Sequence, residues 1–251
     1  VFSARHDAVV RARGRTAVTV EERVYFTGAT LFTFGNSELV PNGRRWRFAT
    51  VLTGAMGLGT ATLAVTYLMQ VLSSVVLKRT VGALISDTGG TPAAIIGRSW
   101  TGETFDGLDL FMSQLTTMLH EITEQHLAYP VLHYYHSEQL RTATSVRIAS
   151  LHELILILCN GVAPEARPSL MTLHPVRDAL AGFGRVLERE FVEAAQGPPP
   201  PPPLAPIREL GVPTVEDAEF FARVAESDKV RRLLLGLVDG DGWAWEDVNR
   251  Q

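Results

Sequence analysis

Residues 48–77 read FATVLTGAMGLGTATLAVTYLMQVLSSVVL, thirty consecutive positions without a charged side chain. Arginines precede this run, and Lys78 and Arg79 follow it. At about 1.5 Å per residue, a helix of this length reaches roughly 45 Å, whereas the hydrocarbon core of a bilayer is about 30 Å thick. The run therefore predicts a membrane span that tilts or projects beyond the bilayer.

The same run has a second interpretation, as the buried core helix of a soluble protein. Threonine, glutamine and serine side chains dilute its hydrophobicity at eight positions. We favour the membrane span because the run is long and carries no charge. Gly54, Gly57 and Gly59 lie within two helical turns, where small residues allow another helix to approach closely or the helix to bend.

The overall composition excludes some classes of protein. The 251 residues carry a formal net charge of −4, which makes nucleic acid an improbable partner. The single cysteine, Cys159, follows an apolar run, so no intrachain disulfide forms and a buried inert thiol is expected. No signal peptide pattern precedes the first apolar run.

The segment before the apolar run has its own pattern. Residues 24–41 read VYFTGATLFTFGNSELVP, a short stretch rich in aromatic residues and threonine that leads into Thr33-Phe34-Gly35. Glu38 and Pro41 follow, and the long apolar run comes next. This order resembles the pore loop of the two-transmembrane potassium channel superfamily, whose filter reads Thr-x-Gly-Tyr/Phe-Gly-Asp-x-x-Pro. The resemblance covers about residues 20–80.

The resemblance implies roles for individual residues. Filter oxygens would come from the backbone carbonyls and the threonine hydroxyl of Thr33, Phe34, Gly35, Asn36 and Ser37. Glu38 would attract cations, and Gly54, Gly57 and Gly59 become candidates for a gating hinge. With one filter segment per chain, the resemblance implies a homotetramer around a shared axis. The permeant ion would be a monovalent cation, K⁺ in the family, with no bound cofactor, no structural metal and no catalytic residue.

Two positions depart from the family pattern. Asn36 stands where the family has an aromatic residue, and Ser37 stands where it has the second glycine. A left-handed backbone at Ser37 would cost about 1–2 kcal/mol per subunit. These departures leave potassium selectivity open. A surface turn of a soluble protein that happens to read Thr-Phe-Gly-Asn-Ser is the alternative.

The rest of the chain predicts helices. Turn signals at residues 87–92 end the long helix, and apolar residues recur at helical spacing over residues 108–122. Further helices are expected over Ser137–Cys159, Pro168–Ala195, Val215–Ala225 and Ser227–Leu237, with Thr214 and Ser227 as capping residues. Strand signals are scarce, so we expect an all-α fold: a re-entrant pore helix, one long transmembrane helix and a cytosolic antiparallel helical bundle.

The predicted organisation has five parts. Residues 1–23 form a solvated extracellular lead-in, 24–79 the pore helix, filter and inner helix, 80–196 a cytosolic helical domain, 197–206 a proline-rich linker, and 207–251 a helical extension. The six prolines at 198–203 favour a stiff polyproline II spacer. We expect a first membrane helix ahead of Val1, and hence a multi-pass protein of the plasma membrane with its C-terminal domain in the cytosol. The basic residues on both sides of the apolar run show no positive-inside bias.

Candidate enzyme and metal sites are weak. His120 and His126 are six residues apart, so the spacing of a zinc-protease helix fails, and partly buried histidines bonded to neighbouring carbonyls are the better interpretation. No nucleophile elbow, phosphate-binding glycine loop or dinucleotide fingerprint is present. The stretch HLAYPVLHYYH at residues 126–136 resembles the helical C-terminal region of some bacterial ion-channel family proteins. An enzyme is therefore not expected.

The sequence thus predicts a subunit that conducts cations passively across a membrane, with a cytosolic helical domain that assembles subunits or senses an unknown ligand. The alternative is a non-conducting, membrane-anchored helical signalling or scaffold protein with a degenerate filter. A soluble intracellular enzyme has little support.

Overall fold

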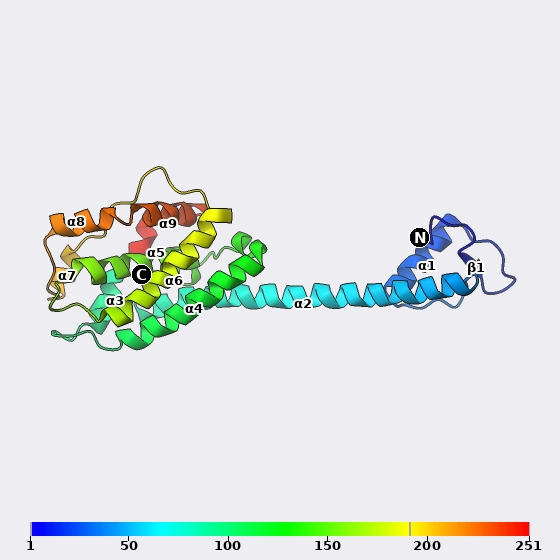
Figure 1. The fold of residues 1–251 in the computed structure, drawn as a ribbon, viewed down its shortest axis with the longest axis horizontal. Helices are drawn as coiled ribbons and strands as arrows, with labels where there is room; N and C mark the ends of the chain where they lie inside the picture. Colours follow the sequence, from blue (N-terminus) through cyan, green and yellow to red (C-terminus); the bar gives the residue numbers. More distant parts are fainter. Residues whose placement is uncertain (1, 191, 251) are drawn as a thin grey trace. The chain divides into compact units, whose positions relative to one another are not determined.

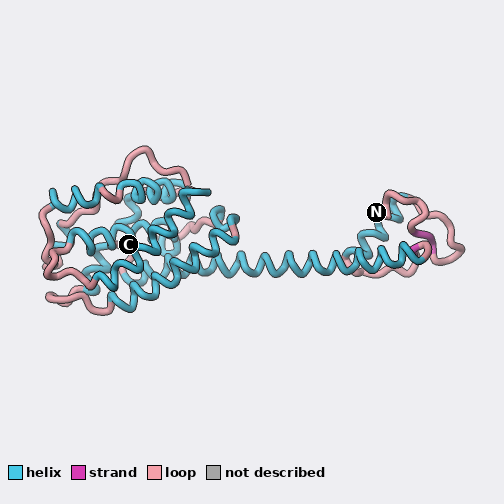
Figure 2. Tube along the Cα trace, in the orientation of Figure 1, coloured by secondary structure: helices cyan, strands magenta, loops and turns pink. Residues whose placement is uncertain are grey.

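The computed structural model describes residues 2–190 and 192–250, and these are mostly helical (Figure 1, Figure 2). The chain divides into two compact units, Val1–Gln70 and Val71–Gln251. The described residues contain one sheet, and it has two strands. The predicted all-α fold class, with one long apolar helix followed by a helical region, is confirmed.

The first unit is built on a short antiparallel ribbon. Strand β1 (Val9–Arg11) pairs with β2 (Leu39–Pro41), and helix α1 (Val20–Leu31) lies between them in the sequence. The pairing brings the start of the chain next to the segment that follows the predicted filter. A small apolar core lies beneath it, made of Phe2, Ala8, Val9, Val18, Phe26 and Leu39, with Trp46 and Ala49 packed against it.

The prediction that residues 1–23 are solvated is wrong for their apolar side chains. Phe2, Ala8 and Val9 are fully buried, and Arg23 is also buried on α1. Other apolar residues of this segment, such as Ala12, Ala17 and Val20, are exposed. Four of the six residues of the small core nevertheless come from this segment.

Helix α2 (Arg44–Thr88) is longer than the predicted span. It begins close to the expected position and continues past Lys78 and Arg79. Val81 and Ile85 are fully buried one turn apart, so the last turns are amphipathic and pack on the second unit. The predicted end is correct, because Gly89 and Gly90 follow with positive φ angles of 150° and 77°.

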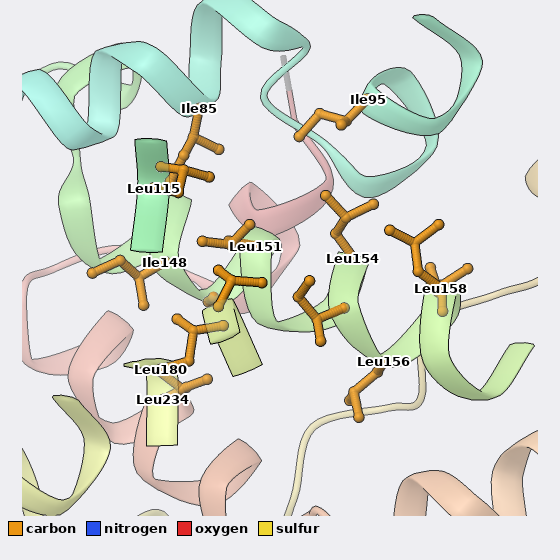
Figure 3. Close-up of a cluster of buried hydrophobic side chains, with 14 of the residues drawn as sticks. Ile85, Ile95, Leu115, Ile148, Leu151, Leu154, Leu156, Leu158, Leu180 and Leu234 are labelled. Atoms are coloured by element: carbon orange, nitrogen blue, oxygen red, sulfur yellow. The ribbon is translucent and has the colours of Figure 1, made fainter. Parts of the chain in front are cut away.

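The second unit is arranged around α5. Its elements are α3 (Pro92–Ser99), α4 (Leu108–Ala128), η1 (Pro130–Tyr134), η2 (Leu140–Thr142), α5 (Thr144–Leu156), η3 (Ile157–Gly161), α6 (Leu170–Glu190), α7 (Ala205–Glu209), α8 (Asp217–Ala225), α9 (Asp228–Gly240) and η4 (Trp245–Asn249). All thirteen residues of α5 are buried, and α3, α6, α9 and η4 pack around it. Figure 3 shows side chains of this core, with Leu151 and Leu154 of α5 among residues from other helices.

The predicted helices of this unit are mostly confirmed, with changes at their ends. The range Ser137–Cys159 contains η2, α5 and the π-helical turn η3 rather than one helix. Thr214 does not cap α8, because Glu216 occupies the N-cap position and the Thr214 hydroxyl accepts a hydrogen bond from Arg208 Nε at 2.7 Å. Ser227 stands at the N-cap of α9 but makes no capping bond with its side chain.

Helices α4 and α6 lie side by side and run in the same direction (Figure 1). Near their starts, the Thr172 hydroxyl donates to Asp109, and further along His126 packs edge-on against Phe183. This pair is therefore parallel, which differs from the antiparallel bundle that we expected. The reason is the connection between them: residues 129–169 hold α5, and such a crossover returns the chain to its starting side.

The proline segment 198–203 packs against the second unit on one side. Pro199 and Pro202 are buried while their neighbours are exposed, as expected for a helix with three residues per turn. Arg231 of α9 donates to the carbonyl oxygens of Pro199 at 2.9 Å and Pro200 at 2.6 Å. The segment is therefore held to the rest of this unit at Pro199, Pro200 and Pro202.

Candidate ion pathway

Helix α1, the predicted pore helix, begins with a capping box. The Thr19 hydroxyl accepts from the backbone N–H of Glu22 at 3.2 Å, and Glu22 Oε2 accepts from the Thr19 N–H at 2.7 Å. Arg11 of β1 also forms an ion pair with Glu22 at 2.8 Å. The start of α1 is therefore tied to the ribbon, which fixes the direction in which its other end points.

Helix α1 ends in a Schellman motif at the predicted filter. The Phe34 N–H donates to the Ala29 carbonyl at 2.9 Å, and the Thr33 N–H donates to the Thr30 carbonyl at 3.2 Å. Thr33 has a φ of 57°, the left-handed conformation that this motif requires and that glycine usually supplies. The first residue of the predicted filter is therefore also the residue that terminates the helix.

The following residues form an irregular turn that leads into β2. Gly35 has a φ of 74°, and nothing lies within 4 Å of where a β-carbon would be. Asn36 Oδ1 accepts from the backbone N–H groups of Glu38 at 2.9 Å and Leu39 at 2.8 Å, so this side chain holds the turn. Ser37 does not have a left-handed backbone, so the cost considered for that position does not arise, and Thr33 carries the left-handed conformation in this segment.

The filter segment is open on its surface. Phe32 and Phe34 are 65% and 82% exposed, and their rings stack with centroids 6.1 Å apart. Thr33, Gly35, Ser37 and Glu38 are exposed as well, and Asn36 is half-buried. Large aromatic side chains and backbone oxygens in this position need a covering partner, either lipid or further copies of the chain.

Close packing joins α1 to α2 within the first unit. A β-carbon on Gly57 would lie 1.8 Å from the carbonyl oxygen of Leu31, and one on Gly54 would lie 3.6 Å from that of Thr30. Gly59 faces open space. Of the three glycines proposed as hinges, Gly57 has a clear packing role, and α2 is continuous through all three. A hinge role stays a prediction.

The apolar part of α2 is exposed on every side over residues 58–70. Leu63, Val65 and Leu68, for example, are 72%, 62% and 53% exposed. Among the described residues, α2 is the helix that is long and apolar enough to cross a membrane. A soluble core helix would bury these side chains, so their exposure favours lipid as their surroundings.

The histidines of the second unit have structural contacts. His126 is buried, and its Nδ1 lies 3.0 Å from the Ile122 carbonyl; burial lowers its pKa to about 4, which keeps it neutral. His136 Nδ1 lies 2.7 Å from Asp241 Oδ1, and His120 is exposed. Within the described ranges, no three metal-ligating side chains come together. The interpretation of a histidine bonded to a neighbouring carbonyl is confirmed for His126.

The second unit also contains hollows in which a small molecule fits. One pocket of about 360 Å³ lies beside Lys78 of α2, and His136 and Asp241 form part of its lining. Lys78 Nζ donates to the carbonyl oxygens of Leu132 at 3.0 Å and Tyr135 at 3.1 Å. Sequence reasoning missed this pocket, because its walls come from segments far apart in the chain.

Sequence reasoning also missed the buried charges, because their partners lie far away along the chain. Glu153 and Arg231 form a bidentate ion pair in the core, with N–O distances of 2.9 and 3.1 Å. Arg147 is also buried on α5, without a carboxylate partner among the described residues. The only signal in the sequence was the presence of Arg147 and Glu153 on a helix that is otherwise strongly apolar.

Comparison with known proteins agrees with the pore segment. The ion channel family matches residues 6–74, which include the ribbon, α1, the predicted filter and the apolar part of α2. Over 245 residues the chain is 28% identical to the uncharacterized membrane protein YdjJ of Bacillus subtilis (strain 168), covering 98% of this chain and 72% of that protein. No solved structure matches the chain. Residues 6–74, which include the predicted filter and most of the predicted span, are therefore similar to the ion channel family.

Proposed function

We propose that this chain is a subunit of a passive cation channel. One observation carries the proposal: α1 ends at Leu31, an exposed left-handed turn follows at Thr33, and the uncharged stretch of α2 packs against the end of α1 through Gly57. A helix that stops partway, an irregular loop with open backbone and a long apolar helix are the parts of a re-entrant pore. The family match over residues 6–74 supports this proposal.

The chemistry of the loop favours cations. Carbonyl oxygens of residues 33–37 and the Thr33 hydroxyl are the ligands that replace the water around a dehydrated cation. Glu38 is exposed next to them and adds a negative charge at the entrance. We propose a monovalent cation, K⁺ first, as the permeant ion. Asn36 holds the turn with its side-chain oxygen, which differs from the packing of an aromatic residue at this position.

Conduction needs more than one copy of the chain. Irregular backbone at membrane depth is stable only where protein or water covers it, so several filter loops must surround one axis. We propose a homotetramer, because each chain supplies one such loop. The exposed Phe32, Phe34 and Tyr25 are then covered by neighbouring subunits and by lipid.

We place the protein in the plasma membrane, with the second unit in the cytosol as a regulatory or assembly domain. Its helices enclose a large apolar core, as expected for a domain that is surrounded by water. The last turns of α2 belong to this unit, so a ligand that changes the conformation of the unit would act on the proposed inner helix. Its role in this proposal is to sense a ligand or to assemble subunits.

Ion flux through proteoliposomes tests the proposal. The full-length protein should carry K⁺ down a gradient, and Thr33→Ala should lower the flux because the hydroxyl is lost. Thr33→Ser is the matched control, since it keeps the hydroxyl. Absence of flux in the unaltered protein, with the assembly intact in the vesicles, would leave only the membrane-anchored scaffold.

A further inference from the structure

A second pocket, of about 270 Å³, lies at the C-terminal end of α2 and is rich in arginine. Arg98, Arg141 and Arg147 line it, together with one carboxylate, that of Asp87. Three positive charges and one negative charge leave an excess of two positive charges around the hollow. Such a balance favours an anion over a cation or an apolar molecule.

Arg147 gives the pocket its buried charge. Its side chain is 2% exposed, and Nη1 donates to the carbonyl oxygens of Gly90 at 2.8 Å and Arg250 at 3.0 Å. Nε is buried and has no partner among the described residues. Burial lowers the pKa of this guanidinium, and the charge of Asp247 opposes that effect without forming an ion pair with it. A buried charge without a counter-ion is costly, so an anion beside it would be stabilising.

The other two arginines are exposed and converge on Asp87. Arg141 Nε and Nη2 donate to the two carboxylate oxygens of Asp87 at 3.0 and 2.8 Å. Arg98 Nη1 donates to the Asp87 backbone carbonyl at 2.6 Å. The Asp87 carboxylate is the one carboxylate in the lining of the pocket, and its side-chain bonds go to Arg141, so the charges of Arg98 and Arg147 have no carboxylate partner in the pocket and favour a ligand that brings several oxygens.

We propose that this pocket binds the phosphate group of a small soluble molecule. Guanidinium groups donate two parallel hydrogen bonds to phosphate oxygens, and several arginines around one phosphate are the usual arrangement for tight binding. The volume is slightly below the range of about 300–1,000 Å³ that is typical of small-molecule pockets. A compact phosphorylated molecule, or phosphate itself, fits this size.

The position of the pocket favours a soluble ligand over a lipid headgroup. From Leu77, where the predicted span ends, to Asp87 the helix rises about 15 Å, whereas the headgroup layer adds only about 5–8 Å on each side of the hydrocarbon core. This step rests on the proposed membrane placement. A phosphate bound here would contact the last turn of the helix that crosses the membrane, and so act on the channel.

Binding of inorganic phosphate to the purified full-length chain in detergent tests the proposal. Calorimetric titration with sodium phosphate, against sodium chloride at equal ionic strength, should show saturable binding. Arg98→Gln and Arg141→Gln should each weaken it about tenfold, because a charge-assisted hydrogen bond is lost at an exposed position that the fold does not need. Asp87→Asn should tighten it, because the competing carboxylate is removed.

Arg177→Gln is the matched control, since Arg177 is an exposed arginine that forms an ion pair with Asp178 away from the pocket. It should leave phosphate binding unchanged. Equal binding by Arg98→Gln and Arg177→Gln, or no saturable binding at all, would overturn the proposal. Binding of vesicles containing phosphatidic acid, without binding of free phosphate, would overturn the soluble source.

Calorimetry does not depend on conduction, so the two proposals fail separately. Flux without phosphate binding would refute the site and leave the channel. Phosphate binding without flux in any sample would refute the channel and leave the site. If both hold, phosphate should change the flux of the unaltered protein at least twofold and leave that of Arg141→Gln unchanged at the same concentration, an expected size of about 0.4 kcal/mol or more.

Discussion

The carbonyl oxygen of Leu31 occupies the space where Gly57 would carry a β-carbon, at a separation of 1.8 Å. Leu31 is the last residue of α1, and Gly57 lies in the part of α2 that we place in the membrane. The contact is between backbones, so neither helix can yield by turning a side chain. It holds the end of α1, and with it the proposed filter loop, against α2.

Gly57→Ala should therefore destabilise the first unit by about 1–3 kcal/mol or more, the usual cost of overpacking. Gly59→Ala should be neutral or slightly stabilising, because that position is open and alanine favours helix by up to about 1 kcal/mol. Thermal unfolding in detergent, followed by circular dichroism, compares the two. Similar melting temperatures for both variants would contradict the close approach of the helices.

Thr33→Gly should raise stability while it lowers conduction. The left-handed backbone at Thr33 costs about 1–2 kcal/mol, and glycine removes that cost at the price of some chain entropy, which leaves a gain of up to about 1 kcal/mol. The loss of the hydroxyl should lower ion flux. Thr27→Gly, inside α1, should lower stability instead. A stability loss at both positions would argue against the Schellman motif.

Acid should destabilise the second unit through His126. Its pKa in the folded protein is about 4, below the ordinary value of 6.5, so the unfolded chain binds a proton first as the pH falls. The contribution of His126 to the free energy of unfolding is fully present above pH 6.5. The free energy of unfolding should decrease by about 3 kcal/mol between pH 6.5 and pH 4. Denaturant unfolding as a function of pH measures this slope. His126→Asn should remove it, whereas the exposed His120→Asn should not.

Breaking the buried ion pair between Glu153 and Arg231 should strongly lower the free energy of unfolding. Glu153→Gln leaves the charge of Arg231 in the core and should cost about 3–5 kcal/mol. Glu219→Gln breaks the exposed pair with Arg223 and should cost less than about 1 kcal/mol. Urea unfolding of both variants provides the comparison. Equal costs would show that Glu153 and Arg231 are more solvated than their contacts indicate.

Local patterns in the sequence predicted much of the pore segment. Absence of charge over residues 48–77 predicted the long helix, and the turn signals at 87–92 predicted its end. The uncharged span stops at Leu77, whereas the helix itself continues to Thr88, and the helical spacing of Val81 and Ile85 marks the apolar face of that continuation. The resemblance raised the cost of a left-handed backbone at Ser37, whereas the end of α1 requires a left-handed residue at Thr33.

Contacts between distant segments could not be predicted in this way. The parallel α4–α6 pair depends on where the chain crosses over through α5, and no short-range pattern reports that. Arg147, Glu153 and Arg231 have partners 57 to 103 residues away along the chain, so their burial gave no local signal. The arginine pocket is missed for the same reason, since its three guanidinium groups come from separate elements.

Chemical block at the filter tests the central claim most directly. In a Cys159→Ala background, Asn36→Cys places a thiol in the proposed pathway, and Ser3→Cys places one on the exposed start of the same unit. A charged, water-soluble methanethiosulfonate reagent should then stop K⁺ flux through Asn36→Cys proteoliposomes and leave the Ser3→Cys protein conducting. Flux through Asn36→Cys that continues after the thiol has reacted completely would show that cations do not pass residues 33–37.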